Sequence, residues 1–472
     1  MEIDASRAFS MMPAHFLPRP VAGAGVFVES VRRKESEQHR ITPVGAGDER
    51  PCDTRGVGGE VEGGRAKGRI VFAAAILFVL ARFVPAESAQ DPMAAMDAME
   101  PMDHWMTMVH AFAFLTYNHQ AGPSGDRDFE SQNHFMLVAM RRWAGGKLSL
   151  LGTFSLEPAT IPAQGSPELF QRGETYQGVL LIDRQHPHDF FIQLAAAWEK
   201  SIFGGGAKLR LELAPVGEPA LGPTAYPHRL SASENPQAPL SHHNQDSTHI
   251  AYDVVSAGLT AGVVSLEGSG FHGAEPDENR WNIQAGKIDS YSGRLTVRPL
   301  AGLSLQFSAG HLEHPEAIED GDQTRVTASA TFERSLPGGY VAATLATGRN
   351  QTEDGPEWGT LLEWTWKFCN ANFLFGRLES VDRDVYELEH KRQRPEGVPH
   401  QRTRVDAATL GYVRNFPGLG TVESGVGGSL TFYRFGSRLD SVYGSAPVSF
   451  NVFVRLRYGT HTGMEMGHSM HH

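Results

Sequence analysis

The stretch FNVFVRLRY at 450–458 decides the fold class of this chain. Successive side chains of an extended strand point to opposite faces. One face of this stretch carries Phe450, Val452, Val454, Leu456 and Tyr458. The other face carries Asn451, Phe453, Arg455 and Arg457. Two arginines do not fit an apolar core, but they fit the wet lumen of a transmembrane β-barrel whose outer face meets lipid.

The same alternation recurs after residue 104, for example at 147–157, 207–213 and 324–334. We find no convincing amphipathic helix in this part of the sequence. The pattern predicts an all-β, antiparallel barrel of about sixteen strands, within a range of about 14–18. The predicted strands lie at 104–118, 132–143, 147–157, 189–200, 207–214, 247–256, 259–270, 286–298, 302–310, 324–334, 339–348, 358–368, 371–381, 404–414, 420–433 and 447–458. The stretch 175–183 is a candidate for an additional strand.

The connections between these strands fall into two length classes. Short connections are predicted at 144–146, 201–206, 256–258, 299–302, 335–339, 369–372 and 416–420. Long ones are predicted at 119–131, 158–188, 215–246, 271–285, 311–323, 349–357, 382–403 and 434–446. Alternating periplasmic turns and long outer loops are the plan of an outer-membrane barrel, which must close because lipid cannot satisfy open strand edges. A soluble β-sandwich or lectin-like array is the alternative, but it would not need to sort its loops by length.

One long loop, at 215–246, is rich in proline. After Pro215 it contains Pro219, Pro223, Pro227, Pro236 and Pro239. A loop of this length in a folded protein is usually functional or ordered by contacts. We therefore expect it to fold inward and to constrict the bore.

Composition excludes several other classes of protein. The chain has 472 residues, a formal net charge of −12 and two cysteines. Two cysteines cannot build a disulfide framework, and no CxxC pair is present to hold zinc. The acidic balance argues against nucleic acid as a partner. The sequence also lacks a GxSxG elbow, an HExxH pair and a phosphate-binding loop, so we do not expect an enzyme.

Residues 65–89, RAKGRIVFAAAILFVLARFVPAESA, predict a signal peptide, with a buried core helix as the alternative. Basic residues precede the apolar run at 70–80, and small residues follow it. The preceding segment, 1–64, shows no sustained periodicity. We expect this segment to be a disordered leader upstream of the true translation start, which would lie near Val57 or Val61.

The predicted barrel at 104–458 is flanked by two segments rich in methionine and histidine, at 90–103 and 459–472. Thioethers favour Cu(I), and imidazoles also bind Cu(II) and zinc. We therefore expect both tails to capture metal in the periplasm. The alternatives are a methionine stripe on a helix for the first tail and a cloning tag for the second. The predicted tail ligands are Met93, Met96, Met99, Met102, Met464, Met466, His468, Met470 and His471.

Two further motifs carry histidines. DRQHPHDFF at 183–191 places His186 and His188 on the same side of an extended segment. ASENPQAPLSHHNQDSTH at 232–249 contributes His242, His243 and His249. If the two segments meet, four or five imidazoles converge on a site for copper or zinc. The alternatives are a proline-pinned turn for the first segment and a self-capped polar loop for the second.

Two resemblances to known proteins follow from these motifs. DRQHPHD together with SENPQAPLSHHNQDSTH looks like a family of uncharacterised bacterial outer-membrane proteins. An exported Met/His-rich segment followed by a barrel resembles the copper-resistance outer-membrane proteins of Gram-negative bacteria. The last strand, alternating and ending in an aromatic residue, resembles the strand that the barrel assembly machinery recognises. These resemblances imply an outer-membrane location and a role with copper or another heavy metal.

The leading hypothesis is therefore an outer-membrane barrel that binds copper, or a related metal, and contributes to metal resistance or transport. Its expected partners are outer-membrane lipid, metal ions, the barrel assembly machinery and periplasmic metal carriers. One alternative is a general porin or solute channel with incidental Met/His tails. The other is an outer-membrane metal-dependent hydrolase.

Overall fold

The computed structural model describes residues 103–317, 321–419 and 422–459. The predicted leader, the predicted signal peptide and all the predicted metal ligands of the two tails lie outside these residues. No helix in the described part of the chain is long and apolar enough to cross a membrane.

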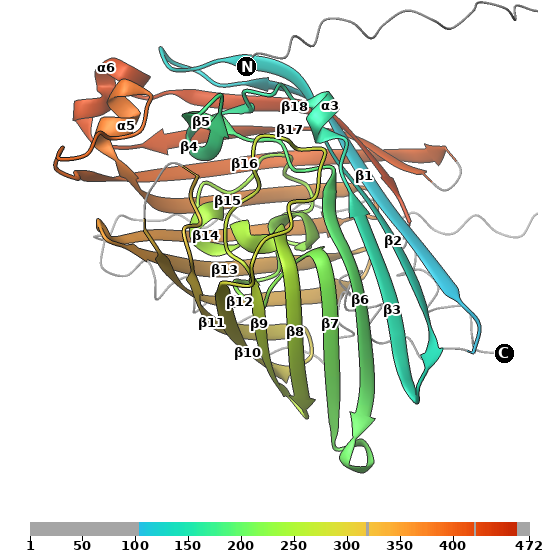
Figure 1. Ribbon diagram of the computed structural model, residues 1–472. Coiled ribbons are helices and arrows are strands. Elements are labelled where there is room, and N and C mark those ends of the chain that lie inside the picture. The colour runs from blue at the N-terminus through green and yellow to red at the C-terminus, as the bar shows by residue number, and fades with distance from the viewer. Residues whose placement is uncertain (1–102, 318–320, 420–421, 460–472) are drawn as a thin grey trace, which may run out of the picture. The chain divides into compact units, whose positions relative to one another are not determined.

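Sixteen antiparallel strands form one closed barrel, in which β1 pairs with β18 to complete the ring (Figure 1). The strands are β1 (Met106–His119), β2 (Arg127–Trp143), β3 (Gly146–Phe154), β6 (Phe191–Ile202), β7 (Ala207–Gly217), β8 (Ala251–Ala261), β9 (Val264–His272), β10 (Ser290–Leu300), β11 (Leu303–Leu312), β12 (Gln323–Leu336), β13 (Gly339–Thr352), β14 (Gly355–Phe368), β15 (Asn372–Asp384), β16 (Arg402–Leu419), β17 (Val422–Arg434) and β18 (Val448–Tyr458). The fold class and the strand number predicted from the sequence are confirmed.

Short helices lie in the connections. The α-helices are α3 (Glu157–Thr160), α4 (His242–Gln245), α5 (Val385–His390) and α6 (Asp440–Tyr443). The 3-10 helices are η1 (Phe203–Gly205), η2 (Tyr226–His228), η3 (Ser247–His249) and η4 (Ser437–Leu439). The long connection between β3 and β6 also carries a separate two-stranded sheet, β4 (Ser166–Tyr176) with β5 (Val179–Gln185). The additional strand considered at 175–183 therefore belongs to this hairpin and not to the barrel.

Two predicted connections were wrong. The long loop expected at 349–357 is a two-residue turn, because β13 and β14 stay paired as far as Thr352 and Gly355. The short turn expected at 256–258 lies inside β8. The chain turns instead after Ala261, where Gly262 has a φ of +56° that suits glycine. In both cases strand pairing continues past the residues that interrupt the hydrophobic pattern.

The outer face of the barrel is apolar. On β18, Val452 is 52% exposed and Val454 is 38% exposed, whereas the alternate residue Arg455 is fully buried. Exposed aromatic side chains lie near both ends of the wall. Those beside the short turns include Trp143, Trp366 and Tyr458, and those toward the long loops include Phe129, Trp358 and Phe432. An apolar band with an aromatic belt at each edge is the surface that a bilayer requires.

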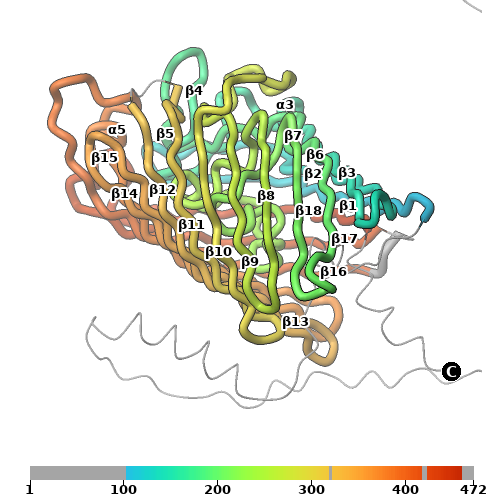
Figure 2. The backbone as a smooth tube through the Cα atoms, turned by 60° about the horizontal axis from the view of Figure 1, so that its bottom comes forward, coloured from blue at the N-terminus to red at the C-terminus, as the bar shows by residue number. Residues whose placement is uncertain are grey.

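The interior is filled by the connection between β7 and β8, residues 218–250, which we call the plug loop. Figure 1 shows this green to yellow-green segment crossing inside the barrel, and Figure 2 shows the strand wall that surrounds it. Helix α4 within it packs against β12, β13 and β14. The predicted inward fold of this loop is confirmed. The predicted wet lumen beside Arg455 and Arg457 is wrong, because the plug loop buries both side chains.

Candidate functional site

The plug loop is fixed to the barrel wall by buried ion pairs. Arg229 of the loop donates from Nε to Glu363 Oε1 of β14 at 2.6 Å, and Ser231 Oγ donates to the same oxygen at 3.0 Å. Arg377 of β15 donates to the other oxygen, Oε2, at 3.1 Å. All three charged side chains are at most 2% exposed. Such a network is strongly destabilised by the loss of one partner, so it holds the loop to one place on the wall.

A second ion-paired group joins the plug loop to two other strands of the wall, β17 and β18. Glu234 of the plug loop pairs with Arg455 and, at 2.7 Å, with Arg457, both on β18. Glu423 on β17 pairs with Arg455 as well. The charged face of the segment 450–458 therefore binds the plug and is not exposed to a water-filled bore.

Glycines on the wall make room for α4. Gly348 and Gly359 are register partners on β13 and β14. A Cβ atom added at Gly348 would lie 1.8 Å from the backbone oxygen of Asn244. One added at Gly359 would lie 2.7 Å from the Asn244 side-chain oxygen. The helix therefore lies directly on strand backbone, which only glycine allows.

The plug loop brings together the five histidines predicted from the two motifs. The ring centroids of His188 and His249 are 5.3 Å apart, and those of His249 and His242 are 5.2 Å apart. His243 lies 5.4 Å from His242 and 5.8 Å from His186 by the same measure. The expected meeting of the segments 183–191 and 232–249 is therefore observed. Their binding of a metal ion stays a prediction.

Three of these imidazoles have Nδ1 held by an oxygen atom. His188 Nδ1 lies 2.8 Å from Glu157 Oε2, and His242 Nδ1 lies 2.8 Å from Asp246 Oδ1. His249 Nδ1 lies 2.9 Å from the Asp246 backbone oxygen. An oxygen partner on Nδ1 fixes the tautomer that leaves a lone pair on Nε2, the usual arrangement around histidines that bind metals. His249 Nε2 is buried and has no hydrogen-bond partner among the described residues.

His186 is held differently, with both ring nitrogens engaged by Glu174. Nε2 lies 3.1 Å from a Glu174 carboxylate oxygen, and the Glu174 backbone N–H donates to Nδ1 at 3.3 Å. Asp189 of the same motif fixes the position of the segment, because its carboxylate accepts hydrogen bonds from the Tyr252 hydroxyl at 2.7 Å and from the Arg280 guanidinium at 3.1 Å. Much of the motif thus positions this segment, and His188 Nε2 itself lies 3.3 Å from the Tyr226 hydroxyl oxygen.

The electrostatic surroundings separate these histidines. Burial lowers the pKa of His249 and His186 well below the ordinary value, so both are neutral near pH 7. Burial also opposes charge on His188, but the adjacent Glu157 carboxylate raises the pKa of this imidazole. Burial would raise the pKa of Asp246, but Arg229 beside it holds that pKa well below its usual range. A neutral His249 next to an ionised Asp246 can act as a ligand without first losing a proton.

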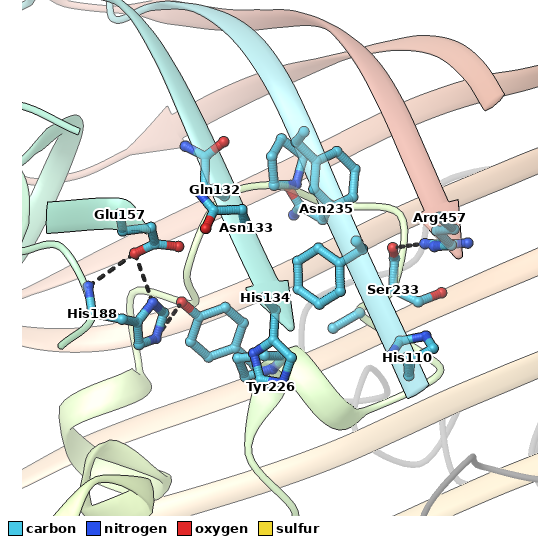
Figure 3. Close-up of a pocket in the computed structure, with 15 residues that line it drawn as sticks. His110, Gln132, Asn133, His134, Glu157, His188, Tyr226, Ser233, Asn235 and Arg457 are labelled. Atoms are coloured by element: carbon cyan, nitrogen blue, oxygen red, sulfur yellow. Dashed lines mark hydrogen bonds and ion pairs between the residues drawn. The ribbon is translucent and has the colours of Figure 1, made fainter. Parts of the chain in front are cut away.

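A second group of histidines was missed by sequence reasoning. His134 on β2 and His228 in the plug loop have ring centroids 4.8 Å apart. His134 lines the small cavity of Figure 3 together with His110, His188 and Tyr226, and this cavity also borders on Arg457. Its volume of about 60 Å³ suits a few water molecules and excludes a larger solute. The two-residue alternation of the strands could have found them, because His110 and His134 occupy inward-facing positions in that pattern.

The hydrolase alternative gains no support from this geometry. His242 and Asp246 form the base and orienting carboxylate that a catalytic triad would need. Ser241 Oγ, however, is buried with no hydrogen-bond partner in the described part of the chain, so it is not bonded to His242.

The closed wall, its apolar outer band and its polar interior decide the class of protein. The protein is a bacterial outer-membrane β-barrel. No known family profile matches this outer-membrane barrel, and no curated protein matches it in sequence.

The chain is similar to several solved porins at low sequence identity. An anion-selective porin from Comamonas acidovorans is 10% identical, with a TM-score of 0.47 over 75% of this chain and 100% of the porin. OprB from Pseudomonas putida is 10% identical, with a TM-score of 0.44 over 79% and 99% of the two chains. OmpT of Vibrio cholerae is 10% identical, with a TM-score of 0.42 over 76% and 100%.

Proposed function

We propose that this outer-membrane barrel is a narrow channel for small solutes or ions, controlled by the plug loop. The observation that carries the proposal is the position of residues 218–250, which cross the interior of a closed sixteen-stranded wall. A barrel of this strand number leaves an aqueous bore unless loops fill it. Passage then requires movement of the plug loop, because buried ion pairs fix it to the wall and the cavity of Figure 3 beside it has a volume of about 60 Å³.

Conductance in planar bilayers tests this function. We expect protein purified from native outer membranes to give rare, small openings. A variant in which residues 221–248 are replaced by a short Gly/Ser linker should conduct continuously, because the wall strands pair with each other and not with the plug. Heat-modifiable migration on a gel reports whether the variant barrel is folded. A folded variant that stays non-conducting would refute the proposal.

We propose a second function, transition-metal binding at His188, His242 and His249. The supporting observation is that an oxygen atom holds Nδ1 of each ring, while adjacent ring centroids lie 5.2–5.3 Å apart. Imidazole nitrogens suit copper and zinc. The Met/His tails, which the sequence predicts to be ligands, would deliver the ion from the periplasm. In this proposal the channel and the metal site belong to one metal-transport or metal-resistance protein.

Metal stoichiometry separates this second function from the channel. We expect His249→Ala to lose about one bound Cu²⁺ or Zn²⁺ per chain relative to the wild type. His314→Ala is the matched control, because His314 is 63% exposed and lies outside the plug. Equal metal content in the two variants would rule out the luminal histidine site while leaving the channel proposal intact.

A further inference from the structure

A different group of ligands lies where the plug meets two outer loops. His243 belongs to α4, Glu275 to the connection between β9 and β10, and Glu316 to the connection between β11 and β12. One ligand atom from each residue can be chosen so that all three lie within 4.8 Å of one another. The group thus joins three segments that are separate in the sequence.

Backbone contacts fix the positions of these residues. The Glu275 N–H donates to the Pro315 backbone oxygen at 2.9 Å, which places Glu275 beside Glu316. The His243 backbone oxygen accepts from Asn350 Nδ2 of β13 at 2.8 Å. The three side chains are therefore brought together by the packing of the plug and the outer loops.

The group contains buried polar atoms without partners. Both carboxylate oxygens of Glu275 and the Nε2 atom of His243 have no hydrogen-bond partner among the described residues. The Glu275 side chain is only 8% exposed, and one of its carboxylate oxygens, Oε1, lies 3.5 Å from His243 Nδ1. Buried acceptors of this kind are costly and call for a ligand.

A guanidinium also lies near both carboxylates. Arg325 is the guanidinium that interacts electrostatically with both Glu275 and Glu316. Its hydrogen bonds go to the neutral groups of Asn350, Ser247 and Gln323, at 2.9–3.0 Å. The Arg325 guanidinium is therefore hydrogen-bonded to neutral partners, while it interacts electrostatically with the two carboxylates.

We propose that His243, Glu275 and Glu316 bind a divalent first-row metal ion, and that this ion clamps the plug loop to the two outer loops. Oxygen and imidazole ligands lie about 2.0–2.2 Å from such an ion, so opposite ligands are about 4.4 Å apart. Small side-chain rotations therefore suffice to close the group around it. Two carboxylates and one imidazole are harder ligands than three imidazoles, so this site accepts Mn²⁺ where the histidine site prefers copper or zinc.

Titration with Mn²⁺, followed by the electron paramagnetic resonance signal of the free ion, tests the proposal on the full chain. We expect one Mn²⁺ per wild-type chain. Glu275→Gln and Glu316→Gln should each weaken binding by more than about tenfold. Glu278→Gln is the matched control, because Glu278 lies in the same loop as Glu275 but accepts from the Gln177 and Gly178 N–H groups. His249→Ala should also keep the Mn²⁺ site.

Wild-type protein that takes up no Mn²⁺, or a folded Glu275→Gln variant that binds like the control, would overturn the proposal. If one glutamine variant fails to fold, the other carries the test. A second measurement, of conductance, rests on the proposed channel function. Mn²⁺ should lengthen the closed periods of the wild-type channel and should not lengthen those of Glu316→Gln. Mn²⁺ binding without any conductance would refute the channel alone, because the binding measurement does not depend on it.

Discussion

Glu363→Gln should release the plug loop without unfolding the barrel. Glu363 is the wall residue on which Arg229 and Ser231 of the plug loop converge, and it also accepts from Arg377 of the neighbouring strand. Glutamine keeps the size of the side chain but replaces one acceptor oxygen by an NH₂ group. A donor would then face a guanidinium in a place that is 1–2% exposed.

The free-energy cost of the substitution depends on the hydrogen-bond partners that Arg229 and Arg377 retain. Removing one partner of a buried ion pair costs about 3–5 kcal/mol. Arg229 still has Asp246 at 2.6 Å, and Arg377 still has the Gln237 backbone oxygen at 3.0 Å, so the lower end of that range applies. A loss of about 3 kcal/mol raises the equilibrium for plug release by about 100-fold. The wall tolerates this loss, because Arg377 becomes hydrated once the plug has moved.

Single-channel recording measures the open fraction directly. We expect it to be about 100-fold higher in Glu363→Gln than in the wild type, as long as openings of the wild type are rare. Glu389→Gln is the control, because its pair with Arg438 at 2.6 Å lies at an exposed guanidinium, where solvent screens the attraction. If folded Glu363→Gln barrels open no more often than Glu389→Gln barrels, the ion pairs do not hold the channel closed.

Three further predictions concern the plug and the tails. Gly348→Ala should displace the plug and raise conductance, because its Cβ would lie 1.8 Å from a plug carbonyl oxygen; Gly268→Ala, whose Cβ has 3.7 Å of room, should behave like the wild type. Burial lowers the pKa of His228 from 6.5 to about 4, so the closed state is fully stable above about pH 6.5 and loses stability as the pH falls. Open fraction should therefore rise by about 100-fold by pH 4, and a His228→Asn channel that keeps the whole rise would contradict this cause. Deleting 91–104 and 460–472 should reduce the Cu(I) stoichiometry measured by titration, and unchanged stoichiometry would end the tail hypothesis.

Local alternation was sufficient to predict the barrel. The faces of the segment 450–458 and the positions of sixteen strands followed from a repeat of two residues, which every strand of a lipid-facing wall must obey. The errors at 256–258 and 349–357 arose because strand pairing continues wherever backbone partners are available, whatever the side chains. The same alternation of side chains also predicts that His110 and His134 face the lumen.

The sequence by itself therefore determined the strand number, the lipid-facing side and the inward course of the proline-rich loop. Only the tertiary structure decided what Arg455 and Arg457 do, because a polar inward face is compatible with either water or a plug. The same holds for the luminal histidines and for the group of His243, Glu275 and Glu316. These residues come from loops far apart in the sequence, and buried ion pairs between the plug and the wall determine which of them meet.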